Sequence, residues 1–223
     1  SRGLGDVSKR QFDTSIFTDY ARFEVQFGNV KRPTARNTTV EQAKFEVLNH
    51  KYTDLSESRY GAALLNDCKY GISVEGGQMR LSLHKGGCRP DYKGDHGVHD
   101  CVYAFLPHQG AFDVNHVVKP AYQLNYPPVL AGKAFIALPL ALPEAENILV
   151  ETIKPCEDEA RAFIVRLYEA EGAFTNTPVR FFAGAKSAAI CNMLEEPQEG
   201  LEDLAKVSLC FHPFEIKTLR VTY

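Results

Sequence analysis

The stretch that decides the fold class is Ile72-Ser73-Val74-Glu75-Gly76-Gly77-Gln78-Met79-Arg80-Leu81-Ser82-Leu83. Hydrophobic and polar side chains alternate on both sides of the two glycines, which is the pattern of strands that bury one face. Glycine reaches the positive φ angles of a two-residue hairpin turn, so Gly76 and Gly77 predict a tight connection. The stretch therefore predicts an antiparallel β-hairpin.

The same period of two recurs along the chain. It is clearest over residues 23–27 and 207–211, and further strands are expected at 45–48, 61–65, 102–106, 148–153, 163–168, 179–182 and 215–222. Helical signals are few, and we expect no more than a turn of helix at 39–44. Many short strands between Gly, Pro, Asn and Asp clusters predict an all-β fold, a large antiparallel β-sandwich followed by a smaller one.

Prolines and glycines divide the chain. Residues 131–147 contain Gly132, Pro139 and Pro143, and we expect a domain boundary there. The larger sandwich is expected over residues 21–140 and the small C-terminal sandwich over 148–223. Residues 1–20 show no clear pattern and are expected to form a linker or a loosely attached arm.

Composition excludes several classes of protein. The formal net charge of the 223 residues is −3, which does not favour binding to nucleic acid or to an anionic membrane. No apolar run approaches the roughly 18 residues that span a bilayer. The six cysteines form no C-x-x-C pair and mostly lie in apolar runs, so we expect reduced thiols in the core, with a disulfide as the alternative.

The densest group of polar side chains lies between Cys88 and Cys101. His96 and His99, with carboxylates and thiols nearby, have ligand types that bind metals, but the spacing lacks a second half and we predict no metal here. A plain surface loop with turn glycines is the simpler interpretation. Planar polar side chains such as Asp95, His96 and His99 also hydrogen-bond sugar hydroxyls well, which makes them candidate substrate-binding residues.

A second polar group, Asn66-Asp67-Cys68-Lys69-Tyr70-Gly71, follows the apolar run 62–65. Asp67, Lys69 and Tyr70 could line a binding cleft at the end of a strand. Alternatively, Asn-Asp is ordinary turn chemistry and Lys69 pairs with Asp67.

Motifs for an independent active site are missing from the chain. It contains no G-x-S-x-G, no H-E-x-x-H and no phosphate-binding or dinucleotide glycine pattern. Adjacent carboxylates such as Glu195 and Glu196 point to opposite faces of an extended strand and are usually solvated. We therefore predict no catalytic residue in this chain.

Several ordered blocks of the sequence are familiar. The most specific block is Gly61-Ala62-Ala63-Leu64-Leu65-Asn66-Asp67-Cys68-Lys69-Tyr70-Gly71, and the others occupy residues 27–34, 43–47, 54–57, 81–83, 90–91, 103–108, 150–154, 165–170 and 213–219. In this order they resemble the C-terminal β region of glycoside hydrolase family 38 α-mannosidases, most closely the cytosolic or vacuolar branch.

The resemblance implies a parent enzyme that is a retaining exo-α-mannosidase acting on mannose-containing oligosaccharides. Its aspartate nucleophile, its general acid and its zinc ligands would lie in an N-terminal α/β barrel, so none is carried over to this chain, and no cofactor is expected in it. The β region would support that barrel, and its loop around Pro90 to His99 would help to wall the sugar pocket. Golgi-type enzymes have an arginine in this loop, whereas this chain has Lys93-Gly94-Asp95-His96.

The resemblance also implies a cytoplasmic location, or alternatively a vacuolar one. The expected partners are the enzyme's own barrel and the oligosaccharide. Because part of the large sandwich would lie upstream of Phe23, unpaired strand edges favour a homo-oligomer in isolation. Two other functions remain open, a free-standing carbohydrate-binding module and an independent hydrolase with a site between Pro90 and Cys101.

Overall fold

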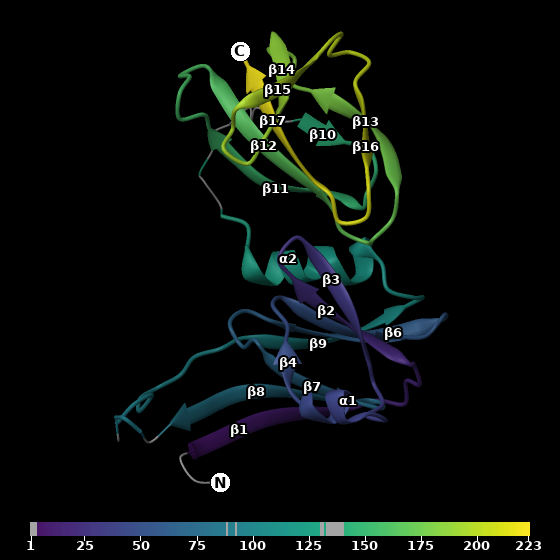
Figure 1. The fold of residues 1–223 in the computed structure, drawn as a ribbon, viewed down its shortest axis with the longest axis vertical. Helices are drawn as coiled ribbons and strands as arrows, with labels where there is room; N and C mark the ends of the chain where they lie inside the picture. Colours follow the sequence, from purple (N-terminus) through teal and green to yellow (C-terminus); the bar gives the residue numbers. More distant parts are fainter. Residues whose placement is uncertain (1–3, 88, 92, 130–131, 133–140) are drawn as a thin grey trace. The chain divides into compact units, whose positions relative to one another are not determined.

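The computed structural model describes residues 4–87, 89–91, 93–129, 132 and 141–223, which form two compact units, residues 1–128 and 129–223 (Figure 1). Antiparallel strands dominate both units, so the prediction of an all-β fold is confirmed. The division between the units falls after Pro128, just before the predicted break at 131–147. Cys88 and most of that break lie outside the described residues.

The first unit contains two sheets. One has the strand order β1-β8-β7-β4 and the other the order β3-β2-β5-β6-β9. Their bounds are β1 (Leu4–Asp13), β2 (Tyr20–Val25), β3 (Gly28–Pro33), β4 (Val47–Leu48), β5 (Tyr52–Ser56), β6 (Tyr60–Asn66), β7 (Gly71–Glu75), β8 (Gln78–Gly87) and β9 (Tyr103–Gln109). A short helix, α1 (Thr39–Ala43), precedes β4 and confirms the turn of helix predicted at 39–44.

The two sheets pack face to face around one hydrophobic core. Phe23 and Leu64 come from one sheet and Ile72 and Leu81 from the other, and all four are at most 2% exposed. Side chains from both sheets bury apolar area against each other, which is the arrangement of a β-sandwich. The predicted hairpin is present as β7–β8, with Glu75 opposite Gln78 and Gly76 at φ 54°.

A helical segment covers the other face of β6. It consists of a π-helical turn, η1 (Val114–Val118), and helix α2 (Lys119–Asn125), with Val117 and Ala121 fully buried. Asn125 Nδ2 donates to the carbonyl of Asn66 at 3.0 Å and fastens the helix to the end of β6. Because both faces of β6 are covered, its sequence is continuously apolar from 62 to 65 and does not alternate.

The N-terminal segment differs from the expectation of an arm. Residues 4–13 form β1, which pairs antiparallel with β8 from Leu4 opposite Gly87 to Asp13 opposite Gln78. The prediction of a linker is therefore wrong for these residues. The strand is polar and lies at the edge of its sheet, so backbone hydrogen bonds to β8, which no side-chain pattern reveals, hold it in place.

The strand predicted over residues 23–27 ends earlier than expected. The strand ends at Val25, and Phe27 lies in the two-residue turn between β2 and β3, at φ 57°. Phe27 continues the alternating pattern of the sequence although it lies in the turn, so the pattern placed the end of the strand two residues too late. The strand predicted at 45–48 is likewise shorter than expected and comprises only Val47 and Leu48.

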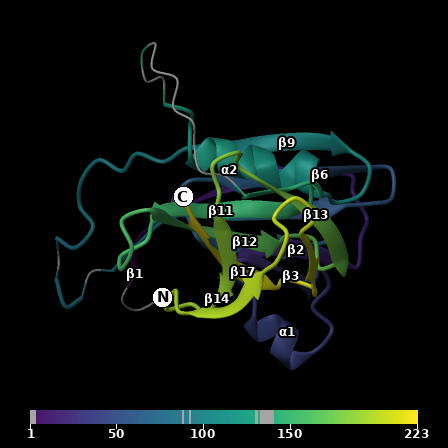
Figure 2. The same cartoon turned by 90° about the horizontal axis from the view of Figure 1, so that it is seen from above.

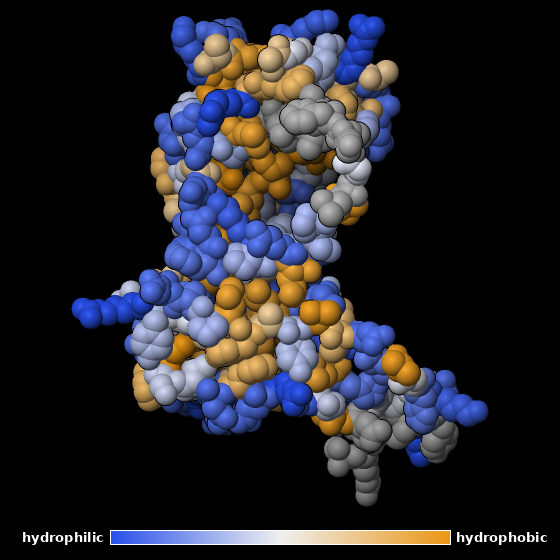
Figure 3. Space-filling view, turned by 180° about the vertical axis from the view of Figure 1, so that it is seen from behind, coloured by the Kyte–Doolittle hydropathy of each residue, from blue (hydrophilic) through white to orange (hydrophobic). Residues whose placement is uncertain are grey.

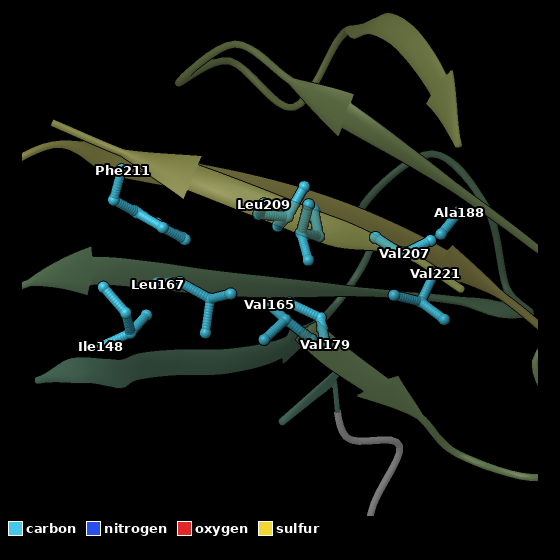
Figure 4. Packing of buried hydrophobic residues seen from close by; sticks show 10 residues of the cluster. Ile148, Val165, Leu167, Val179, Ala188, Val207, Leu209, Phe211 and Val221 are labelled. Carbon is cyan, nitrogen blue, oxygen red and sulfur yellow. The ribbon is translucent and has the colours of Figure 1, made fainter. Parts of the chain in front are cut away.

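The second unit is a smaller sandwich. Its sheets have the orders β10-β13-β16 and β11-β12-β17-β14-β15. The strands are β10 (Ala141–Pro143), β11 (Ile148–Pro155), β12 (Ala162–Glu169), β13 (Thr175–Phe181), β14 (Ser187–Cys191), β15 (Pro197–Leu201), β16 (Ser208–Phe211) and β17 (Ile216–Thr222). Side chains from both sheets meet in its core, including Leu167 and Val221 from one and Phe211 from the other (Figure 4).

Hydrophobic side chains also reach the surface of each unit (Figure 3). Phe17 is 83% exposed and Leu194 is 79% exposed. Within the described residues, no helix has the length and apolar character needed to cross a membrane.

Candidate functional site

The segment between β8 and β9 runs out past the strand ends before it returns to β9 (Figure 2). Asp95, His96, Gly97 and His99 from this loop and His84 from β8 line a hollow of about 310 Å³. The structure thus brings together the three loop residues that the sequence singled out. His84 also lines the hollow. The sequence did not suggest this residue, because it lies on β8 and the candidate residues lie in the loop that follows.

Backbone conformation shapes this hollow. Asp95 adopts φ 60°, in the left-handed region that Asp tolerates better than most residues. Its carbonyl accepts a hydrogen bond from His99 Nε2 at 2.7 Å, and the His96 backbone N–H donates to the carbonyl of Lys93 at 3.1 Å. These bonds fold the loop back on itself, and Asp95, His96 and His99 line the same hollow.

Two imidazole rings face each other at the hollow. The ring centroids of His84 and His99 lie 4.8 Å apart with an interplanar angle of 49°. Asp95, His96 and His99 are all exposed, so their polar atoms are open to a ligand. The imidazoles supply N–H donors and lone pairs and the carboxylate supplies acceptors, a set that suits hydroxyl groups in several orientations.

His96 and His99 have ligand types that bind metals. Across the described ranges, no three His, Cys, Asp or Glu side chains lie close enough together to hold an ion.

The second predicted group lies at the end of β6. The Asp67 backbone N–H donates to the carbonyl of Val102 at 3.1 Å, which ties this turn to the end of the β8–β9 loop. Among the described residues, Lys69 and Asp67 form no ion pair, and the Lys69 backbone N–H donates to Asn66 Oδ1 at 2.7 Å. The expected turn chemistry is present at Asn66, while the expected Lys69–Asp67 pair is not.

Tyr70 is about half exposed, and its ring lies edge-on to His50 with centroids 5.1 Å apart. The lining of the hollow, as the described residues define it, includes His84 and the loop but not Asp67, Lys69 or Tyr70. The two predicted groups are thus joined through the backbone at Val102, and their side chains form separate surfaces.

Cys68, in the second group, is held as a neutral thiol. A hydrogen bond to the Asp67 carboxylate, together with burial and the negative charge, raises the pKa of Cys68 to about 11. A thiol is a weak nucleophile until it ionises, so Cys68 is not an activated cysteine. Cys68 and Cys210 are exposed and Cys156 and Cys191 are buried, so the prediction that the thiols lie in the core is right for only part of them.

Sequence comparison identifies two domains. The family model described as "Glycosyl hydrolases family 38 C-terminal domain" matches residues 6–93, and "Glycosyl hydrolases family 38 C-terminal beta sandwich domain" matches residues 147–219. The first match covers most of the first unit and the second match lies within the second unit.

Individual relatives agree with these matches. The chain is 36% identical to Alpha-mannosidase 2C1 of Homo sapiens over 95% of its own length, and 40% identical to Alpha-mannosidase G of Dictyostelium discoideum over 90%. It covers 21% and 19% of those two proteins. The chain therefore spans about one fifth of the length of these relatives.

A solved structure has the same fold. The chain aligns with an alpha-mannosidase from Enterococcus faecalis V583 at a TM-score of 0.77 and 19% identity, over 95% of this chain and 25% of that one. This likeness shows the fold, and the two family matches, which cover well over half of the residues, settle the classification. The chain belongs to glycosyl hydrolase family 38 and consists of its C-terminal β domains.

Proposed function

We propose that this chain is the non-catalytic C-terminal region of a retaining exo-α-mannosidase, which supports the catalytic barrel and contributes one wall of its mannose pocket. The observation that carries the proposal is the hollow lined by His84, Asp95, His96 and His99. It lies in the loop expected to face the sugar, in a chain that spans about one fifth of relatives named α-mannosidases.

The chemistry of the hollow fits a positioning role. Hydrolysis with retention requires two carboxyl groups about 5 Å apart on opposite sides of the glycosidic bond, which we assign to the barrel, together with its zinc. Imidazole and carboxylate groups of the loop would hydrogen-bond sugar hydroxyls and fix the orientation of the ring. Correct placement of the reacting sugar is itself a large part of catalysis.

The turn at Asp67, Lys69 and Tyr70 is proposed as a secondary part of the same wall. Its support is the hydrogen bond from Asp67 to Val102, which couples the turn to the end of the loop. We further propose that the intact enzyme works in the cytoplasm or in a vacuole. The five described cysteines are all free thiols, as is usual for proteins kept in a reducing compartment.

The test is an NMR titration of the 223-residue chain with methyl α-mannoside, in which the histidine ring signals are observed. The chain has seven histidines, of which His84, His96 and His99 line the hollow. We expect these three signals to shift selectively with millimolar affinity, because a single wall buries little of the sugar. Shifts spread evenly over all seven, or no shifts at all, would contradict a sugar-facing loop.

A free-standing carbohydrate-binding module is the second candidate. Exposed aromatic side chains favour it, since Tyr20 is 55% exposed and Tyr70 is 49% exposed, and such rings stack on sugars. Micromolar binding of mannose by the chain alone would favour this module over a pocket wall.

A further inference from the structure

A second hollow opens at the edge of the first sandwich, away from the β8–β9 loop in sequence. It has a volume of about 330 Å³ and lies beside β3 and β4, each the last strand of its sheet. Its floor is apolar and includes Phe23, Val47 and Val74, which belong to the sandwich core or pack against it. A small molecule that enters the hollow can therefore contact side chains of the sandwich core.

Positive charge surrounds this floor. The lining contains four cationic side chains, Lys31, Arg32, Arg36 and Lys44, and one carboxylate, Glu41. Glu41 is already engaged, because its Oε2 accepts from the backbone N–H groups of residues 37 and 38, each at 2.8 Å. The bond from residue 38 is one half of the capping box of α1, and both bonds lower the pKa of Glu41. The lining therefore has a net positive charge that its own acid does not neutralise.

Arg32 lies over the apolar floor. Its guanidinium lies 4.8 Å from the ring centroid of Phe23, and Nη1 donates to the carbonyl of Leu48 at 3.1 Å. Burial lowers the pKa of Arg32, and among the described residues no carboxylate forms an ion pair with it. A partly desolvated cation without a counter-charge is costly, so an anion that enters the hollow would relieve that cost.

The other three cations differ in whether a carboxylate forms an ion pair with them. Arg36 lies 3.3 Å from Glu75 and also donates to the carbonyl of Phe45. Lys31 and Lys44 are exposed and have no ion pair within the part of the chain that the structure describes. Arg32 and Lys44 are therefore available together for one negative group, whereas Lys31, the neighbour of Arg32 on β3, points to the other face of the strand and also lines a different hollow.

We propose that this hollow binds a small organic anion, with an apolar, ring-sized body on Phe23, Val47 and Val74 and a phosphate or carboxylate between Arg32 and Lys44. The volume lies at the lower end of the range for small-molecule pockets, about 300 Å³ upward. Neither the apolar floor nor the cations alone would select this class of ligand, but their combination does. The site is separate from the loop proposed to face mannose.

Phenyl phosphate is a probe that carries both features, and the test is calorimetric titration of the 223-residue chain. Inorganic phosphate serves as the control for charge and phenol as the control for the apolar ring. We expect phenyl phosphate to bind at least tenfold more tightly than either control, and its affinity to fall as salt is added. Equal affinity for phenyl phosphate and inorganic phosphate would overturn the proposal.

Two substitutions in α1 locate the site. Val40 lines the hollow and is 60% exposed, whereas Gln42 is exposed on the same helix outside the lining. Val40→Asp places a carboxylate among the cations and should abolish phenyl phosphate binding, while Gln42→Asp should change the affinity less than twofold. Lys44→Gln should weaken binding at least threefold, and Lys206→Gln in the second unit should not. Equal losses in Val40→Asp and Gln42→Asp, with both variants folded by circular dichroism, would sink the assignment.

Discussion

His108 Nε2 lies 2.8 Å from Asp54 Oδ1, and both side chains are at most 2% exposed. The two residues belong to β9 and β5, which lie on either side of β6. His108 is paired across the strands with Gly61, so its imidazole extends over that glycine to reach the carboxylate. The hydroxyl of Ser56 donates to the other oxygen of Asp54. A buried polar cluster thus joins β5 and β9 across the intervening strand β6.

Gly61 is required by this cluster. A Cβ at position 61 would lie 2.5 Å from His108 Cε1 and 2.7 Å from Ser56 Oγ. We expect Gly61→Ala to push the imidazole away from Asp54 and to lower the free energy of unfolding by about 2–3 kcal/mol in urea denaturation. Gly200→Ala is the matched control, because nothing lies within 4 Å of its Cβ position. A loss below about 0.5 kcal/mol for Gly61→Ala would mean that the imidazole can move freely.

His108 should make the stability depend on pH. Burial alone would lower its pKa, but the hydrogen bond and charge of Asp54 outweigh burial, so the pKa of His108 is raised. A raised pKa means that the folded state binds the proton more tightly than the unfolded state does. The stabilisation is therefore complete below pH about 6.5, the unfolded value, and is lost as the pH rises through the folded value.

The measurement is urea unfolding of the wild type and of His108→Gln at pH 6 and pH 8.5. The loss of stability caused by the substitution should be larger at pH 6. In an Asp54→Asn background the difference between the two pH values should shrink, because the main cause of the shift is gone. A larger loss at pH 8.5 would show that the sign of the shift is wrong.

Cys68 should resist alkylation because of its neighbour. With a pKa of about 11, only about 0.3% of this thiol is ionised at pH 8.5, against about half for an unperturbed cysteine. We expect Asp67→Asn to accelerate the reaction of Cys68 with iodoacetamide by at least tenfold at that pH, as followed by peptide mass spectrometry. Cys210, exposed in the other unit, supplies the internal standard. An unchanged rate at Cys68 would show that Asp67 does not control its ionisation.

Glu169 organises the second unit. Its carboxylate is fully buried and accepts hydrogen bonds from the backbone N–H groups of Glu171, Gly172, Ala173 and Phe214, at 2.7–3.1 Å, and from the Asn147 amide at 2.9 Å. Glu169→Ala leaves these donors without their acceptor and should cost about 3 kcal/mol or more.

The Glu169 prediction is checked by thermal unfolding of Glu169→Ala beside Glu202→Ala, which truncates an exposed glutamate. The control should stay within about 0.5 kcal/mol of wild type. Equal melting temperatures for the two variants would rule out a structural role for the Glu169 carboxylate.

Strands with one buried face were predictable from the sequence. The β7–β8 hairpin follows directly from alternation and a Gly-Gly turn, since Val74 and Leu81 face the core. The strands β11, β12 and β17 were found in the same way. By contrast, β1 has few apolar side chains and β15 none before Leu201, so backbone pairing defines them and composition does not.

The covering helix was missed although a signal existed. Val114, Val117, Val118 and Ala121 are all buried and have the spacing i, i+3, i+4, i+7 of an apolar helical stripe. Pro120 lies inside that stripe and suggests a break, but it occupies the first turn of α2, where proline is tolerated. The change from π-helical to α-helical turns at Lys119 shortens each regular stretch further.

Only the loop residues of the candidate site could be predicted from the sequence. Asp95, His96 and His99 are close in sequence, so their clustering could be inferred from the chain alone. His84 reaches the hollow from β8 because the strand extends to Gly87, well past the alternating run that identified it. The second hollow had no sequence signal, since its cations and its floor come from four separate segments.

The central claim is that the chain supports and shapes a mannosidase site without catalysing the reaction itself. The most direct test is to assay the 223-residue chain with p-nitrophenyl α-mannoside, with and without added zinc. We predict no release of p-nitrophenol above the uncatalysed background under either condition. Turnover that disappears in Asp95→Asn or His99→Ala would contradict the claim and would locate an active site in the β8–β9 loop.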